Sequence, residues 1–149
     1  ATNDKGHSPL HFLCQNPNVT LSIIQLFINA APNSVRSISN QGEMPLNRLC
    51  ASDKVDEAVA IQILKLLLEK CPEAVQHADN RGLLPIHRAG GMRSPEFCQM
   101  LIEAYPGSER ITNADRMLPL HRACAKNSLA TVKYLYNLYP DAINHATYG

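Results

Sequence analysis

The stretch Leu118-Pro119-Leu120-His121-Arg122-Ala123-Cys124 decides the fold of this 149-residue chain, because weaker copies of it recur upstream. The copies are Ser8-Pro9-Leu10-His11, Met44-Pro45-Leu46-Asn47-Arg48-Leu49-Cys50 and Leu84-Pro85-Ile86-His87-Arg88-Ala89. The prolines of successive copies are 36, 40 and 34 residues apart. A period in this range is typical of a solenoid, in which similar units stack side by side.

The proline of each copy predicts the start of a short first helix, because its fixed φ and missing N–H suit the first helical position. A tight turn precedes it, with a glycine in three units and Arg116 in the fourth. A second helix follows, which begins after an N-capping hydroxyl and ends before a second proline. The four predicted units span residues 3–38, 39–78, 79–112 and 113–146. The turn glycines are Gly6, Gly42 and Gly82, the caps are Thr20, Ser94 and Ser128, and the closing prolines are Pro32, Pro72, Pro106 and Pro140.

The second unit carries an insertion at residues 53–58. Two of these residues correspond to Pro17-Asn18 of the first unit and lengthen the loop between the helices. The other four correspond to about one helical turn. They predict a longer second helix with Asp56 as its N-cap and Glu57 at the positive end of the helix dipole.

Composition limits the class of protein without naming its function. The chain is 45% hydrophobic with a net charge of +1, so no overall field favours nucleic acid or a membrane surface, and no apolar run is long enough to span a bilayer. Five cysteines are an odd number, which argues against a disulfide framework and for an intracellular, reducing compartment. Cys14, Cys50 and Cys124 each lie three residues after the His or Asn of the motif, so we expect them at one buried position.

The pattern resembles the ankyrin repeat family, whose unit is a hairpin turn, Thr-Pro-Leu-His-x-Ala on a first helix, and a second helix, at about 33 residues. The resemblance implies an all-α, ankyrin-type solenoid of four stacked helix-turn-helix repeats with short hairpin loops between them. It also implies that the motif histidine binds the backbone of the hairpins. The family's threonine is kept only as Ser8, since Met44, Leu84 and Leu118 stand in the other copies. Tetratricopeptide repeats have a similar period but lack a glycine turn before Pro-Leu-His.

Motifs for catalysis or metal binding are weak. His11 and Cys14, or His121 and Cys124, could each offer two metal ligands on one helix face. Equivalent side chains of neighbouring units are about 10 Å apart, however, which is too far to share one ion. The sequence shows no nucleophile elbow, zinc-protease motif or phosphate-binding loop, and Gly90-Gly91 is interpreted as a break in a short helix. We therefore expect neither an enzyme nor a bound metal or cofactor.

The expected function is protein–protein interaction, through the concave groove that the resemblance places along the hairpin tips and first helices. Charged groove positions are Lys5, Arg48, Arg81, Arg88, Arg122 and Lys126 against Asp4, Glu43 and Asp115, a net charge of +3. Arg48, Arg88 and Arg122 share one position in three consecutive units, and a guanidinium suits carboxylates or phosphates. The predicted partner is an acidic, amphipathic peptide or protein. The predicted contact residues are Arg48, Arg81, Leu83, Arg88, Met92, Met117, Arg122 and Lys126.

Three alternatives stay open at this stage. The arginines could cover the stack with their aliphatic stems and bind only solvent or local carbonyls. The same arginine ladder could bind phosphates of nucleic acid or lipid, although the low net charge argues against this. The chain could also be a spacer in a larger assembly. We expect a piece of a longer array whose ends pack on further repeats or neighbouring subunits, with Leu10, Phe12 and Leu13 uncovered at one end and Tyr134, Tyr136 and Tyr139 at the other.

Overall fold

The computed structural model describes residues 4–126 and 128–146, and within them it is all-helical. Eight α-helices and four 3₁₀ segments follow one another in these ranges, with no strand. The α-helices are α1 Pro9–Leu13, α2 Leu21–Ala30, α3 Pro45–Ala51, α4 Glu57–Lys70, α5 Pro85–Met92, α6 Pro95–Ala104, α7 Pro119–Lys126 and α8 Leu129–Leu138. The 3₁₀ segments are η1 Pro32–Arg36, η2 Pro72–Gln76, η3 Ser108–Arg110 and η4 Pro140–Asn144.

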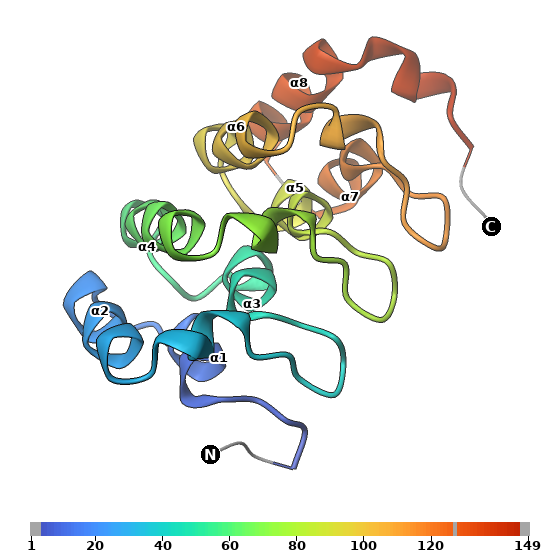
Figure 1. The fold of residues 1–149 in the computed structure, drawn as a ribbon. Coiled ribbons are helices and arrows are strands. Elements are labelled where there is room, and N and C mark those ends of the chain that lie inside the picture. Colours follow the sequence, from blue (N-terminus) through green and yellow to red (C-terminus); the bar gives the residue numbers. More distant parts are fainter. Residues whose placement is uncertain (1–3, 127, 147–149) are drawn as a thin grey trace.

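The helices form two layers that run the length of the stack (Figure 1). Helices α1, α3, α5 and α7 form one layer, and α2, α4, α6 and α8 form the other. The hairpin loops between units extend from the stack at the side of the first layer (Figure 1). This arrangement confirms the predicted solenoid, because each unit packs mainly on its immediate neighbours.

Local sequence signals set the helix boundaries. Each first helix begins at its motif proline. The predicted caps are also confirmed, since the hydroxyls of Thr20, Ser94 and Ser128 accept from the backbone N–H three residues later. In the second unit the Asp56 carboxylate accepts from two backbone N–H groups, and α4 has 14 residues where α2, α6 and α8 have 10. The insertion therefore adds one helical turn, as predicted.

The second proline of each unit does more than end a helix. In the first and second units, Pro32 and Pro72 each begin a 3₁₀ segment that leads to the next hairpin, and in the fourth unit Pro140 begins the 3₁₀ segment Pro140–Asn144. In the third unit Gly107, with φ of 88°, precedes the 3₁₀ segment instead. The sequence pattern predicts these prolines only as helix ends, so the 3₁₀ segments are an additional feature of the structure.

The turns have the predicted backbone geometry. Gly6, Gly42 and Gly82 have φ between 75° and 79°, and Arg116 has φ of 61° at the fourth tip. Successive tips are tied together, because Asn40 N–H donates to the Lys5 carbonyl (2.8 Å) and Asn80 N–H donates to the Gln41 carbonyl (3.0 Å). A Cβ at Gly42 would collide with Asn80 of the next tip, so glycine is needed there for space as well as for φ.

Two expectations about the motif helices are wrong. Gly90 and Gly91 do not break a helix, since α5 continues through both to Met92. Gly90 instead allows α5 and α7 to approach closely, because an added Cβ would lie 2.9 Å from the Pro119 carbonyl oxygen. Cys124 is exposed, whereas Cys14 and Cys50 at the same position are fully buried. Units two and three cover the two buried cysteines, but no described unit covers Cys124.

Arg93 joins three units and is almost fully buried. Its guanidinium donates to the Leu49 carbonyl (2.8 and 3.2 Å) and the Val55 carbonyl (3.2 Å), and it forms an ion pair with Glu57 (3.0 Å). From the other side, the Thr131 hydroxyl donates to the Arg93 carbonyl oxygen (2.9 Å). Arg93 thus satisfies a carbonyl at the C-terminal end of α3 and links the second unit to the fourth.

Candidate functional site

The motif histidines hold the hairpin loops in place. His11, His87 and His121 bind backbone carbonyls of a later segment through Nε2, at 2.7, 2.8 and 3.0 Å. The Nδ1 atom of each ring accepts the N–H of the residue before the helix proline, at 2.8 to 3.0 Å. This pair of bonds requires the neutral ring with its proton on Nε2. Burial lowers the pKa of His87 to about 4 and also lowers the pKa of His11.

Asn47 replaces the histidine in the second unit without loss of either bond. Its Oδ1 accepts from Met44 N–H (2.8 Å), and its Nδ2 donates to the His77 carbonyl (3.1 Å). The motif position therefore has a structural role in all four units. Among the described residues, no group of three or more His, Cys, Asp or Glu could hold a metal ion.

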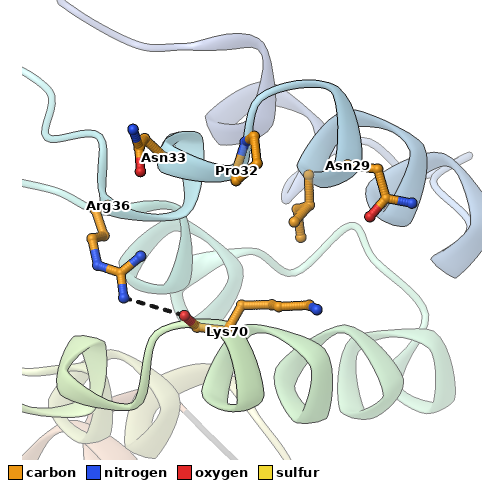
Figure 2. Close-up of a pocket in the computed structure, with 6 residues that line it drawn as sticks. Asn29, Pro32, Asn33, Arg36 and Lys70 are labelled. Carbon is orange, nitrogen blue, oxygen red and sulfur yellow. Dashed lines mark hydrogen bonds between the residues drawn. The ribbon is translucent and has the colours of Figure 1, made fainter.

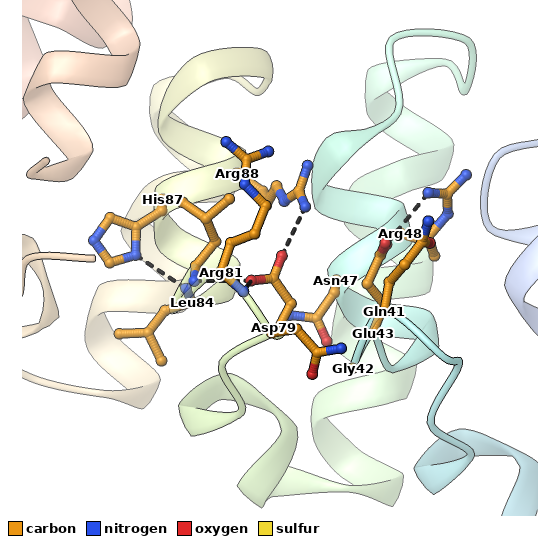
Figure 3. Close-up of polar contacts among 12 residues, drawn as sticks. Gln41, Gly42, Glu43, Asn47, Arg48, Asp79, Arg81, Leu84, His87 and Arg88 are labelled. Carbon is orange, nitrogen blue, oxygen red and sulfur yellow. Dashed lines mark hydrogen bonds and ion pairs between the residues drawn. The ribbon is translucent and has the colours of Figure 1, made fainter. Parts of the chain in front are cut away.

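The outward side of the first helices carries the arginine ladder, which consists of Arg48, Arg88 and Arg122. Arg48 forms an ion pair with Glu43 (3.3 Å) and donates to the Gln15 side-chain oxygen. Arg88 forms an ion pair with Asp79 (2.7 Å), which Figure 3 shows between α5 and the preceding hairpin. The structure therefore places two of the three arginines against carboxylates of their own chain.

Arg122 differs from the other two arginines. Its side chain is half-buried, and within the described part of the chain it has no hydrogen-bond or ion-pair partner. Burial lowers the pKa of Arg122, and the nearby charges of Arg88 and Arg81 lower it further. Arg122 is thus the uncompensated member of the ladder.

The remaining predicted contact residues are divided by their exposure. Arg81, Met92 and Lys126 are exposed, and Met117 is half-buried. Leu83 is 0% exposed, so the expectation that it contributes to the surface is wrong. Glu43 lies at the same position of the second unit and is also buried. Met117 of the fourth unit, at the same position, is half-buried, so exposure at this position differs between units.

A polar hollow of about 340 Å³ lies between the second and third hairpin tips. It is continuous with the arginine ladder, because Arg48 and Arg88 line it (Figure 3). The Glu43 and Asp79 side chains are only 5% and 2% exposed, whereas those of Arg48 and Arg88 are 24% and 19% exposed. The other lining residues are Asn40, Gln41, Asn80 and Arg81.

Comparison with known families bears on the repeat pattern directly. A family model described as ankyrin repeats matches residues 55–145 in three copies, which is more than half of the chain. The chain belongs to the ankyrin repeat family. No curated protein sequence matches it. Ankyrin repeats generally mediate protein–protein interaction and are typically not enzymes.

The cysteines of this ankyrin array do not provide a reactive thiolate in the core. All five are free. Burial raises the pKa of both Cys14 and Cys98 to about 12, and it raises the pKa of Cys50 as well. A thiol with so high a pKa is protonated at neutral pH and is a poor nucleophile.

Another hollow of the ankyrin array, of about 420 Å³, is lined by residues from the end of α2, η1 and the end of α4 (Figure 2). The Arg36 guanidinium at this site is already bound by the Glu73 carboxylate (2.9 Å) and the Lys70 carbonyl (3.3 Å). Its cationic group is therefore neutralised, in contrast to Arg122. Among the described helices, none is long and apolar enough to cross a bilayer.

Proposed function

We propose that this ankyrin repeat chain is a protein-interaction module that binds a partner along its groove. The groove is defined by the hairpin tips and the outward residues of α1, α3, α5 and α7. The proposed contact residues are Arg48, Arg81, Arg88, Met92, Met117, Arg122 and Lys126.

The single observation that supports this proposal is the unequal exposure of opposite charges in the groove. The carboxylates of Glu43 and Asp79 are buried, while the arginines that they bind remain partly exposed. A partner would therefore meet mainly guanidinium groups, together with the exposed charges of Arg81 and Lys126. Complementary charge favours fast and selective association, so the partner surface should be acidic.

Apolar side chains beside these charges favour an amphipathic partner. Met92 is 36% exposed, and Phe12 occupies the position of the ladder arginines in the first unit and is 45% exposed. Methionine and aromatic side chains provide adaptable contact area in binding surfaces. The partner should therefore carry apolar residues next to its acidic ones.

A random-peptide selection tests the proposal, because it does not require the natural partner. Peptides selected on the immobilised chain should be enriched in Asp and Glu. The chemical-shift changes that they cause in the NMR spectrum of the chain should map to groove residues. The triple variant Arg81→Glu/Arg122→Glu/Lys126→Glu should no longer bind the selected peptides. A matched triple variant on the other face, Lys65→Glu/Lys70→Glu/Lys133→Glu, should still bind the selected peptides. Selected peptides that lack acidic residues or map to α2, α4 and α6 would refute the proposal.

Nucleic acid is the rival ligand for the same ladder. Phosphate contacts predict an affinity that falls steeply with salt, in proportion to the number of phosphates neutralised. The chain as a whole carries a net charge of only +1, so no overall positive field favours a polyanion. Fluorescence polarisation with labelled single- and double-stranded oligonucleotides should therefore show no binding at physiological salt, and tight binding there would favour the rival.

A spacer function is favoured by a different observation, the uncovered apolar ends of the stack. Ile23 and Phe27 are 39% and 38% exposed, although residues at their positions in the later units are buried. At the other end Ile143 is 71% exposed, whereas Val35 and Val75 at its position are buried. Leu10, by contrast, is buried, so the expectation that it lies at an uncovered end is wrong. Sedimentation over a range of concentrations measures self-association of the chain and of the end variants Phe27→Lys and Ile143→Lys. If neither variant alters self-association, the result would count against packing at these ends.

A further inference from the structure

Two of the ladder arginines, Arg48 and Arg88, bind acceptors at three positions that recur in each unit. One is the position of Gln15, just after the first helix of the preceding unit, whose side-chain oxygen binds Arg48. The second is the position of Glu43, two residues before the helix proline, whose carboxylate also binds Arg48. The third is the position of Asp79, at the start of the hairpin, whose carboxylate binds Arg88.

All three acceptor positions are unsuitable around Arg122. The position of Gln15 is occupied by Gly91, which has no side chain, and the position of Glu43 is occupied by Met117. The position of Asp79 is occupied by the neutral Asn113, whose side-chain oxygen accepts from Asp115 N–H and Met117 N–H (2.9 Å each). The sequence of the fourth unit therefore removes every intramolecular anion that the other arginines use.

The surroundings of Arg122 are cationic and partly closed to water. The like charges of Arg88 and Arg81 disfavour the charged form of Arg122. The facing carboxylate is Asp79, but this group already binds Arg88 and accepts from Arg81 N–H and Leu83 N–H (2.9 and 3.0 Å). The Arg122 side chain lies along the α5 backbone, with its Cβ and Nε at 3.6 and 3.7 Å from the point where a Gly91 Cβ would be. Glycine thus leaves the space beside the guanidinium open.

We propose that Arg122, with Arg81 and Arg88, forms a carboxylate-binding subsite of the groove that receives one Asp or Glu side chain of the partner. This inference rests on the proposed function and assigns the acidic contact to one place. A carboxylate can bind a guanidinium through two parallel N–H···O bonds, and this pairing is strongest where water is partly excluded. The incoming carboxylate would give Arg122 the anionic partner that Arg48 has in Glu43 and that Arg88 has in Asp79.

The experiment measures glutarate binding to the isolated chain through the NMR signals of the arginine Nε–Hε groups. Glutarate is a dicarboxylate, and one of its carboxylates represents the side chain of the partner without the rest of a peptide. Sodium chloride keeps the ionic strength constant. The Arg122 signal should shift and saturate, while the Arg48 signal should stay in place. Arg122→Gln should abolish the saturable shifts at Arg81 and Arg88.

Two substitutions restore an internal anion and should therefore compete with glutarate. Asn113→Asp copies the Asp79–Arg88 pair, and Met117→Glu copies the Glu43–Arg48 pair. Each should weaken glutarate binding by roughly tenfold or more. Gln25→Glu adds the same charge on α2, in the other helix layer and outside the hollow that Arg81 and Arg88 line, and should change the affinity less than about twofold. Thermal melts of all variants show whether the fold is retained, and because the two substitutions are independent, one suffices if the other unfolds.

Three results would overturn the subsite. These are an Arg122 signal that changes only in proportion to added salt, unchanged glutarate affinity in both Asn113→Asp and Met117→Glu, or an equal loss of affinity in Gln25→Glu. Failure of the subsite can be distinguished from failure of the proposed function. Acidic peptides that still map to the groove while glutarate fails to bind would remove the subsite alone, whereas glutarate binding without any groove-binding peptide would remove the proposed function.

Discussion

At the scale of single residues, the buried histidines link the stability of this ankyrin array to pH. His87 accepts Leu84 N–H at Nδ1 and donates from Nε2 to Ile111, so protonation of Nδ1 would remove the first bond. The pKa of His87 is lowered to about 4, below its value of about 6.5 in an unfolded chain. Between these two pH values the unfolded state binds more protons, so stability is fully present above pH 6.5 and falls as the pH drops toward 4.

The variant His87→Asn should reduce this dependence. Asn47 shows that asparagine can make both bonds at this position without titrating. Urea unfolding should give a lower free energy of unfolding for the parent chain at pH 4.5 than at pH 7.5. His87 should contribute about 3 kcal/mol of this difference at most. The difference between the two pH values should be smaller in the variant, with a remainder from His11. An unchanged difference would contradict the role assigned to His87.

At the scale of helices, the close approach of α5 and α7 depends on a glycine. A Cβ at Gly90 would lie 2.9 Å from the Pro119 carbonyl oxygen, which is too close without movement of the backbone. A Cβ at Gly91 would find no atom nearer than 3.6 Å. Both residues are helical, so alanine would be favoured at either position by helix propensity alone.

The matched substitutions Gly90→Ala and Gly91→Ala should therefore have opposite effects. Gly90→Ala should lower the free energy of unfolding by about 1 to 3 kcal/mol, because overpacking outweighs the gain in propensity. Gly91→Ala should leave it unchanged or raise it by up to about 1 kcal/mol. Chemical denaturation of both variants measures this difference. Similar destabilisation by both substitutions would mean that close packing at Gly90 is not the cause.

At the scale of the whole molecule, Arg93 connects units that are not neighbours in sequence. It binds Leu49, Val55 and Glu57 of the second unit, and it accepts a hydrogen bond from Thr131 of the fourth. Most contacts in a solenoid are local to adjacent units, so a connection across three units should increase the cooperativity of unfolding.

The variant Arg93→Met tests this connection. It keeps an apolar stem but leaves the Leu49 and Val55 carbonyls without the Arg93 donor and removes the ion pair with Glu57, which should cost about 3 kcal/mol. Arg36→Met is the control, because the Arg36–Glu73 pair is exposed at the surface and its loss should leave the free energy of unfolding almost unchanged. Unfolding followed by circular dichroism should also broaden in Arg93→Met. Equal stability of the two variants would show that Arg93 does not hold the stack together.

The sequence by itself determined the solenoid, the helix starts at Pro9, Pro45, Pro85 and Pro119, and the extra turn of α4 after Asp56. These features depend on backbone geometry and on hydrogen bonds within a few residues, so a local pattern predicts them. Only the tertiary structure decided which equivalent residues are covered, as Cys50 and Cys124 show. It also decided which arginines find an internal anion, because Arg48, Arg88 and Arg122 share one motif position but face different side chains of other segments. Burial and charge pairing depend on what the neighbouring units place opposite each residue, and a motif read within one unit does not contain that information.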